Sequence, residues 1–167
     1  MLSHISCQDD ESQRYHRLWK VLATESSSAP RGIPRESVDA GKAVTVLTYL
    51  HGVAESMSSI DEIKIKGQDI DLIELRTLKP LDMDTIRKSL ERTNKLIILD
   101  ESTKSGGVGA TVSSSVSEDM FDLLDAPVMR LSMDDTPVPY ASAMEKVVVK
   151  RGADLVEGVE KMCAQRF

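Results

Sequence analysis

The sequence predicts an α/β domain built around a largely parallel sheet. Short apolar runs rich in β-branched residues alternate with segments of about ten to fifteen residues that have helical spacing, which is the pattern of right-handed βαβ units. Aromatic residues make up only 4% of the chain, so the core must be aliphatic. A chain of 167 residues is long enough to form one domain with a substantial core.

The first regular elements begin after residue 41. Residues 43–49 are apolar and β-branched and predict a strand. Residues 52–65 place apolar side chains near helical spacing, and Gly67 is positioned to end that helix. Residues 70–75 predict the second strand.

The second half of the chain repeats the alternation. Asp82 follows a proline break and predicts the N-cap of a helix through Arg92. The remaining predicted elements, in chain order, are a strand at 96–99, a helix from 106 to 120 or 124, a strand at 127–131, an apolar run at 147–149 and a closing helix at 153–164.

Residues 1–40 differ from the rest and predict an irregular tail or linker, followed by one domain over residues 41–167. Ser26–Pro34 has a linker composition without any period. Residues 15–24 could form a short helix with Leu18, Trp19 and Leu22 on one side. An alternative to a simple tail is therefore an arm that docks on a partner.

Composition excludes several classes of function. The formal net charge is −6, which argues against nucleic-acid binding because that affinity is built from clustered Lys and Arg. Cys7 and Cys163 form no CxxC pattern, so a disulfide framework or a zinc site is not expected. No apolar run approaches the ~20 residues of a membrane span. The first residues lack the apolar region of a secretory signal and carry acidic residues that transit peptides avoid.

The segment Asp100–Ala110 is the leading candidate site. It joins a predicted strand to a predicted helix, where open α/β sheets meet ligands or partners. Gly106, Gly107 and Gly109 could present backbone N–H groups to a phosphate, but the spacing matches neither GxGxxG nor a P-loop. The alternative is a tight turn whose glycines let the helix approach the sheet or a neighbouring subunit.

Acidic pairs close two of the predicted strands. Asp100 and Glu101 are adjacent on an extended chain and must point to opposite sides. We expect one of them to cap the turn and the other to face a partner or cleft. Asp134 and Asp135 close the last strand in the same way, so both pairs can share one rim.

Other candidate groups lack partners in the sequence. His51 is the only histidine of the regular region and reads as a loop or cap residue. Cys163 is expected to be packed rather than reactive. The serines at 113, 114, 115 and 117 lack a nucleophile-elbow context. No complete catalytic set is present.

Four motifs together resemble a known family. Residues 73–82 (IELRTLKPLD) and the turn 100–110 are similar to segments of the transketolase C-terminal domain. Residues 124–128 (LDAPV) and 135–141 (DTPVPYA) resemble, in this order, the beta subunit of pyruvate dehydrogenase, in its plastid and cyanobacterial branch. The resemblance covers about residues 41–164.

The resemblance implies a three-layer α/β/α sandwich with a mixed, mostly parallel sheet. It also implies that this chain holds no cofactor, because thiamine diphosphate and magnesium are bound by the preceding domain of the beta subunit and by the alpha subunit. We therefore expect a fragment, a truncated product or a free-standing copy of the C-terminal domain, without catalysis of its own.

The role implied by the resemblance is assembly. The expected partners are the pyruvate dehydrogenase alpha subunit, a second beta subunit and the basic peripheral subunit-binding domain of the dihydrolipoyl acyltransferase. The resemblance places Asp125 and the carboxylate of Phe167 at the last contact, and assigns Gly106, Gly107 and Gly109 to close packing. Alternatives are the C-terminal domain of another transketolase-like enzyme, such as deoxyxylulose-phosphate synthase, and a stand-alone flavodoxin-like binding module. The residues of the last two motifs resemble those of the plastid and cyanobacterial branch, which predicts a plastid or cytoplasmic location rather than a mitochondrial one.

Overall fold

A computed structural model describes residues 39–164 of the chain. One five-stranded sheet has the strand order β1-β3-β2-β4-β5. The elements in chain order are β1 (Asp39–Ala40), β2 (Val44–Thr48), α2 (His51–Ile65), β3 (Ile70–Glu74), α3 (Met83–Thr93), β4 (Leu96–Thr103), α4 (Val108–Asp119), a 3₁₀ turn (Phe121–Leu123), β5 (Met129–Met133), α5 (Ser142–Val148) and α6 (Gly152–Ala164).

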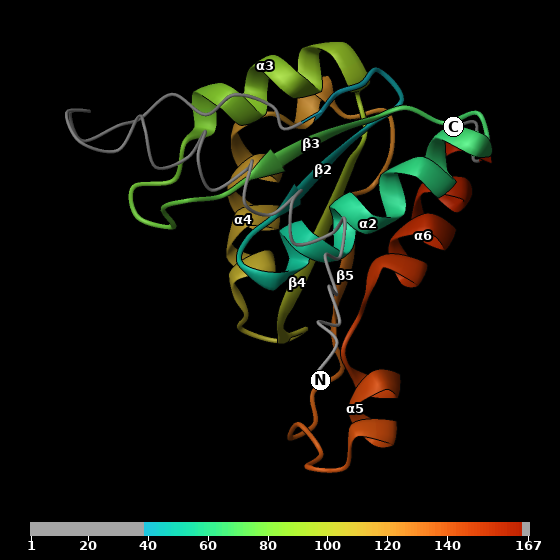
Figure 1. The fold of residues 1–167 in the computed structure, drawn as a ribbon. Helices are drawn as coiled ribbons and strands as arrows, with labels where there is room; N and C mark the ends of the chain where they lie inside the picture. Colours follow the sequence, from blue (N-terminus) through green and yellow to red (C-terminus); the bar gives the residue numbers. More distant parts are fainter. Residues whose placement is uncertain (1–38, 165–167) are drawn as a thin grey trace, which may run out of the picture. The chain divides into compact units, whose positions relative to one another are not determined.

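The sheet is mixed and mostly parallel. Strands β2, β3, β4 and β5 pair in parallel, whereas β1 pairs antiparallel with β3 at the edge. The parallel part follows from the helices that separate consecutive strands, because a parallel pair needs a crossover connection. Helices cover both faces of the sheet (Figure 1). The predicted three-layer α/β/α fold is therefore confirmed.

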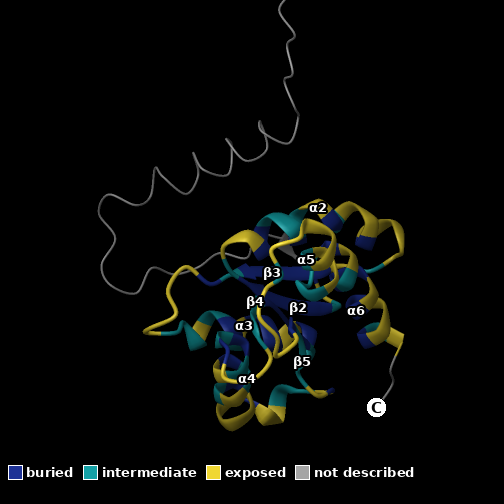
Figure 2. Cartoon of the chain, turned by 90° about the horizontal axis from the view of Figure 1, so that it is seen from below, coloured by how far each residue is buried: buried dark blue, intermediate teal, exposed yellow. Residues whose placement is uncertain are grey.

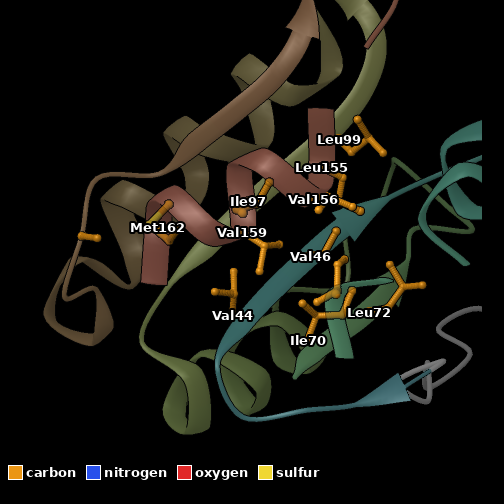
Figure 3. Packing of buried hydrophobic residues seen from close by; sticks show 12 residues of the cluster. Val44, Val46, Ile70, Leu72, Ile97, Leu99, Leu155, Val156, Val159 and Met162 are labelled. Carbon is orange, nitrogen blue, oxygen red and sulfur yellow. The ribbon is translucent and has the colours of Figure 1, made fainter. Parts of the chain in front are cut away.

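The face covered by α2 and α6 holds one half of the core. Figure 3 shows Val44 and Val46 of β2 and Ile97 of β4 beside α6, with Ile70 and Leu72 of β3 farther along the same face. Successive strand residues point to opposite faces, so alternate positions contribute to this side. The fully buried members of this cluster are Val44, Val46, Ile63, Ile70, Leu72, Ile97, Leu99, Leu155, Val159 and Met162.

The other face packs against α3 and α4. Leu47, Ile73 and Ile98 come from the intervening strand positions, and Ile86 and Leu90 come from α3. Because the sheet is covered on both sides, its central strands are buried on both sides: β2 and most of β3 and β4 are buried, and β2 and β3 appear dark blue in Figure 2. This explains the continuous apolar runs in the sequence.

Local signals set several element ends. The side chain of Asp82 accepts a hydrogen bond from the Thr85 backbone N–H at 3.1 Å, so the predicted N-cap of α3 is confirmed. Gly67 follows the end of α2 with a φ of +78°, a conformation that glycine adopts without strain. Within the described residues no helix has the length and apolar character needed to cross a membrane.

Several predicted boundaries were wrong. β4 continues to Thr103 through an irregularity in its pairing with β5, and β5 begins two residues later than expected. α4 ends at Asp119. The apolar run at 147–149 belongs largely to α5, which the β-branched valines concealed. The predicted helix at 15–24 lies outside the described residues, as does the predicted tail except for Asp39 and Ala40.

Candidate functional site

The carboxyl ends of the four parallel strands form one edge of the domain. β2 leads there into α2, β3 into the loop before α3, β4 into the glycine turn, and β5 into residues 134–141. We call this the carboxyl edge. Sheets of this kind meet ligands and partners at such an edge.

Asp100 caps the turn that follows β4. Its side chain is buried, with only 2% of its surface exposed. Oδ1 accepts hydrogen bonds from the backbone N–H and the hydroxyl of Ser102 at 2.5 and 2.6 Å. Oδ2 accepts from the Gly109 N–H at 2.6 Å. The prediction that one residue of the acidic pair caps the turn is thus confirmed.

The same contacts bear on anion binding at the start of α4. A free helix N-terminus attracts phosphate through its unpaired N–H groups and its dipole. Here the carboxylate of Asp100 already occupies that position and accepts from Gly109. A phosphate would have to displace a buried, hydrogen-bonded carboxylate. The geometry favours the tight turn over a nucleotide site.

Each glycine of the turn has a distinct geometric role. A Cβ on Gly107 would lie 2.1 Å from Ser102 Oγ and 2.3 Å from the Thr103 carbonyl oxygen. A Cβ on Gly109 would lie 2.1 Å from Asp100 Oδ2. Gly106 has open space around it but a φ of +68°. Two glycines therefore permit close approach, and the third permits the left-handed backbone.

The two acidic strand ends share one rim. Asp135, after β5, accepts hydrogen bonds from the Ser105 N–H at 2.8 Å and from the Ser105 hydroxyl at 2.5 Å. These bonds lower the pKa of Asp135, with the serine hydroxyl as the main cause. The turns after β4 and β5 are thereby joined, as expected for neighbouring parallel strands.

Tyr49, at the carboxyl end of β2, lies near the buried Asp100. Burial is the main cause that raises its pKa, and the charges of Asp100 and Glu101 raise it further. A hydrogen bond with Ser102 opposes this effect. The phenol is therefore held in its protonated form and supplies no base at neutral pH.

The remaining predicted candidates show no catalytic arrangement. His51 is the first residue of α2, and its Nε2 lies 3.3 Å from Glu55 Oε1. The free thiol of Cys163 is half-buried, and burial raises its pKa. Across residues 39–164 no group of three His, Cys, Asp or Glu side chains is placed to hold a metal ion.

Asp125 lies at the opposite edge, in the loop between the 3₁₀ turn and β5. Its side chain is exposed, and its backbone N–H donates to the Asn94 carbonyl oxygen at 2.8 Å. The loop is therefore anchored while the carboxylate faces solvent. The structure does not bring Asp125 together with the glycine turn. Phe167 lies outside the described residues.

The structure has an apolar surface at the carboxyl edge that was not predicted from the sequence. Between residues 39 and 164, six of the eight exposed large apolar side chains come after the carboxyl ends of strands: Leu50, Leu78, Val138, Tyr140, Met144 and Val147. In sequence, Tyr140, Met144 and Val147 are spaced at i, i+4 and i+7; Met144 and Val147 lie on one side of α5 (Ser142–Val148), and Tyr140 lies just before it. That spacing was the signal that could have revealed the surface from the sequence.

The segment that carries most of this surface is residues 134–149, which we call the arm. It contains α5, in which no residue is buried. Figure 1 shows α5 set apart from the sheet and from the other helices. The arm therefore exposes apolar side chains that the rest of the domain does not cover.

Comparisons with known proteins agree with this architecture. A family model described as "Transketolase, C-terminal domain" matches residues 35–153. A solved structure titled "Split gene transketolase, inactive beta4 tetramer" superposes with a TM-score of 0.70 at 19% identity, covering 84% of this chain and 45% of that one. At this identity the likeness shows the fold alone.

Curated relatives are beta subunits. The pyruvate dehydrogenase E1 component subunit beta of Staurastrum punctulatum is 37% identical over 128 residues, which is 77% of this chain and 39% of that protein. The chloroplastic subunit beta-2 of Arabidopsis thaliana is 38% identical over 77% of this chain and 32% of its own length. The subunit beta of Rickettsia felis is 38% identical over 74% of this chain and 38% of its own length.

The chain thus spans between about a third and two fifths of the length of these relatives. The family model covers the five strands, helices α2 to α5 and the arm. Because the family model matches well over half of the residues and the fold agrees with it, the chain belongs to the transketolase C-terminal domain family.

Proposed function

We propose that this chain is the assembly domain of a thiamine diphosphate-dependent pyruvate dehydrogenase beta subunit and is not catalytic alone. Its similarity to beta subunits from plastid and bacterial sources supports the proposal. The observation that carries it is the exposed apolar arm. A domain that leaves Tyr140, Met144 and Val147 uncovered is suited to bury them against another subunit.

The proposed partners of the carboxyl edge are the alpha subunit and a second beta subunit. The solved transketolase with the same fold is described as a beta4 tetramer, and we propose that this domain likewise associates with other subunits. Apolar side chains at the centre of an interface contribute most of the binding energy, and aromatic residues such as Tyr140 are common among them.

The described residues do not fit the cofactors of the parent enzyme. Thiamine diphosphate requires a diphosphate site with magnesium, but the start of α4 is occupied by Asp100. No cluster suited to a metal ion is present between residues 39 and 164. We propose that other parts of the enzyme hold the cofactors, and we derive no catalytic step through this domain.

A second contact is proposed at the opposite edge, with the peripheral subunit-binding domain of a dihydrolipoyl acyltransferase. The exposed carboxylate of Asp125 suits a basic partner, because a carboxylate accepts paired hydrogen bonds from an arginine. The Phe167 carboxylate is proposed to join it. We also extend a plastid location to this chain from its chloroplastic relatives.

Complementation tests the proposed function. The isolated chain with thiamine diphosphate, magnesium and pyruvate should give no turnover. Adding it to an alpha subunit together with a chloroplastic beta subunit that lacks its own C-terminal domain should restore turnover. Turnover by the isolated chain, or no restoration by a correctly folded chain, would reject the proposal.

The docking contact predicts a separate effect. Replacing Asp125 with Ala should weaken binding to the subunit-binding domain by about tenfold or more, because a desolvated charge pair loses one partner. The matched control is Asp122→Ala, since Asp122 is also acidic and exposed three residues away. Isothermal titration calorimetry measures both. Equal affinity for the two variants would remove Asp125 from the contact.

A further inference from the structure

The attachment of the arm to the rest of the domain depends on few side chains. None of the residues of α5 is buried, so apolar packing does not hold this helix in place. Glu145, in the middle of α5, places its Oε1 3.3 Å from Nη2 of Arg151. Arg151 stands immediately before α6 and belongs to the packed part of the domain.

Arg151 bridges two carboxylates on two different helices. Its Nη1 lies 3.2 Å from Glu55 Oε1 on α2, while its Nη2 faces Glu145 on α5. The guanidinium is the planar fork that can bind two acceptors at fixed angles. We call the trio of Glu55, Arg151 and Glu145 the fork.

Hydrogen bonds hold the part of the fork that lies between α2 and the start of α6. Glu55 Oε2 accepts the Gly152 N–H at 3.0 Å, and the Arg151 N–H donates to Asp154 Oδ2 at 2.9 Å. A Cβ on Gly152 would lie 2.8 Å from the Glu55 carbonyl oxygen, so the start of α6 lies directly against α2. Glu55 and the start of α6 are therefore held together, and the guanidinium of Arg151 extends from Glu55 to Glu145 on α5.

We infer that Arg151 is a positioning residue that orients α5, so that Met144 and Val147 on α5 and Tyr140 just before it, together called the stripe, are presented to a partner in one arrangement. The second part of this inference rests on the proposed assembly function. Fixing a binding element before association lowers the ordering cost of binding. Loss of the fork should loosen α5 first and weaken association as a consequence.

Hydrogen exchange followed by mass spectrometry tests the first part on the full chain. Glu145→Ala removes the α5 side of the fork but leaves the contact between Arg151 and Glu55. Exchange of the α5 amides should become about two- to fivefold faster, the range expected for a partly exposed ion pair, with α3 and α4 unchanged. His51 Nε2 also lies 3.3 Å from Glu55 Oε1. All variants are therefore compared at one pH, near 8, so that this second contact of Glu55 is the same in every experiment.

Further variants separate positioning from a general structural effect. Glu145→Gln keeps an acceptor oxygen and should recover part of the wild-type protection. Arg151→Lys keeps the charge but cannot reach both carboxylates and should behave like Glu145→Ala. Lys146→Met, on the same exposed helix, is the control and should leave exchange unchanged. Unchanged α5 exchange in Glu145→Ala and Arg151→Lys would overturn the inference.

Association is then measured by sedimentation equilibrium with the subunits of the complementation experiment. The inference expects Glu145→Ala to weaken association and Glu145→Gln to recover part of it. If substitutions in the stripe weaken association but the fork variants do not, the positioning role is wrong. If the fork variants loosen α5 but no arm substitution affects association, the first part stands and the proposed function fails.

Discussion

The packed body of the domain and its arm contain similar apolar residues in opposite surroundings. In the body, which is the sheet with α2, α3, α4 and α6, Ile86 and Leu90 have none of their surface exposed. In the arm, Tyr140 is fully exposed and Val147 is 76% exposed. The apolar side chains of the body stabilise the fold of this chain, because folding removes their surface from water. The arm gains nothing of this kind within one chain, which is why we assign it to association.

The largest expected effect on stability is in the body. Gly107→Val would place a side chain 2.3 Å from the Thr103 carbonyl oxygen, and a backbone atom cannot move aside as a side chain can. We expect a loss of about 3 kcal/mol in the free energy of unfolding, measured by urea denaturation.

The neighbouring glycine is the matched control. Gly106→Ala meets no atom within 4 Å and is strained only by its φ of +68°, so it should cost about 1 kcal/mol. Equal losses for the two substitutions would show that close approach of α4 to the strand end is not what requires Gly107.

The smallest expected effect on stability is in the arm. Tyr140→Ser and Met144→Ser remove side chains that are already in water, so each should change the free energy of unfolding by no more than about 0.5 kcal/mol. A loss comparable to that of Gly107→Val would show that the arm is packed in solution, and the contrast between arm and body would disappear.

Local patterns predicted the body well. The β-branched runs at β2 and β3 and the Asp82 cap each depend on residues close in sequence, and the alternation of elements then determines the parallel topology. The resemblance supplied the third layer and the mixed sheet. The capping role of Asp100 was also within reach, because Ser102 lies only two residues away in sequence.

The features that could not be predicted from the sequence are of two kinds. Some depend on contacts between residues far apart in the chain, and others are elements that have no buried side chains. Glu55 and Arg151 are separated by 96 residues, and no local pattern relates them. α5 is a seven-residue helix with no buried residue, so it has no apolar periodicity facing the core, and only the apolar run at 147–149 was recognised in this segment. The end of β4 was placed too early because its last residues are polar and serve the turn rather than the core.

The central claim is that the arm is an association surface. Sedimentation equilibrium of the chain with its proposed subunits tests it most directly, using the double variant Tyr140→Ser with Met144→Ser. The control is Ile65→Ser, which removes an equally apolar side chain, 85% exposed, at the end of α2 away from the carboxyl edge. We predict that the arm variant weakens association by at least about tenfold, which is about 1.4 kcal/mol, and that the control associates like the unaltered chain. Association of the arm variant at unaltered strength would contradict the account.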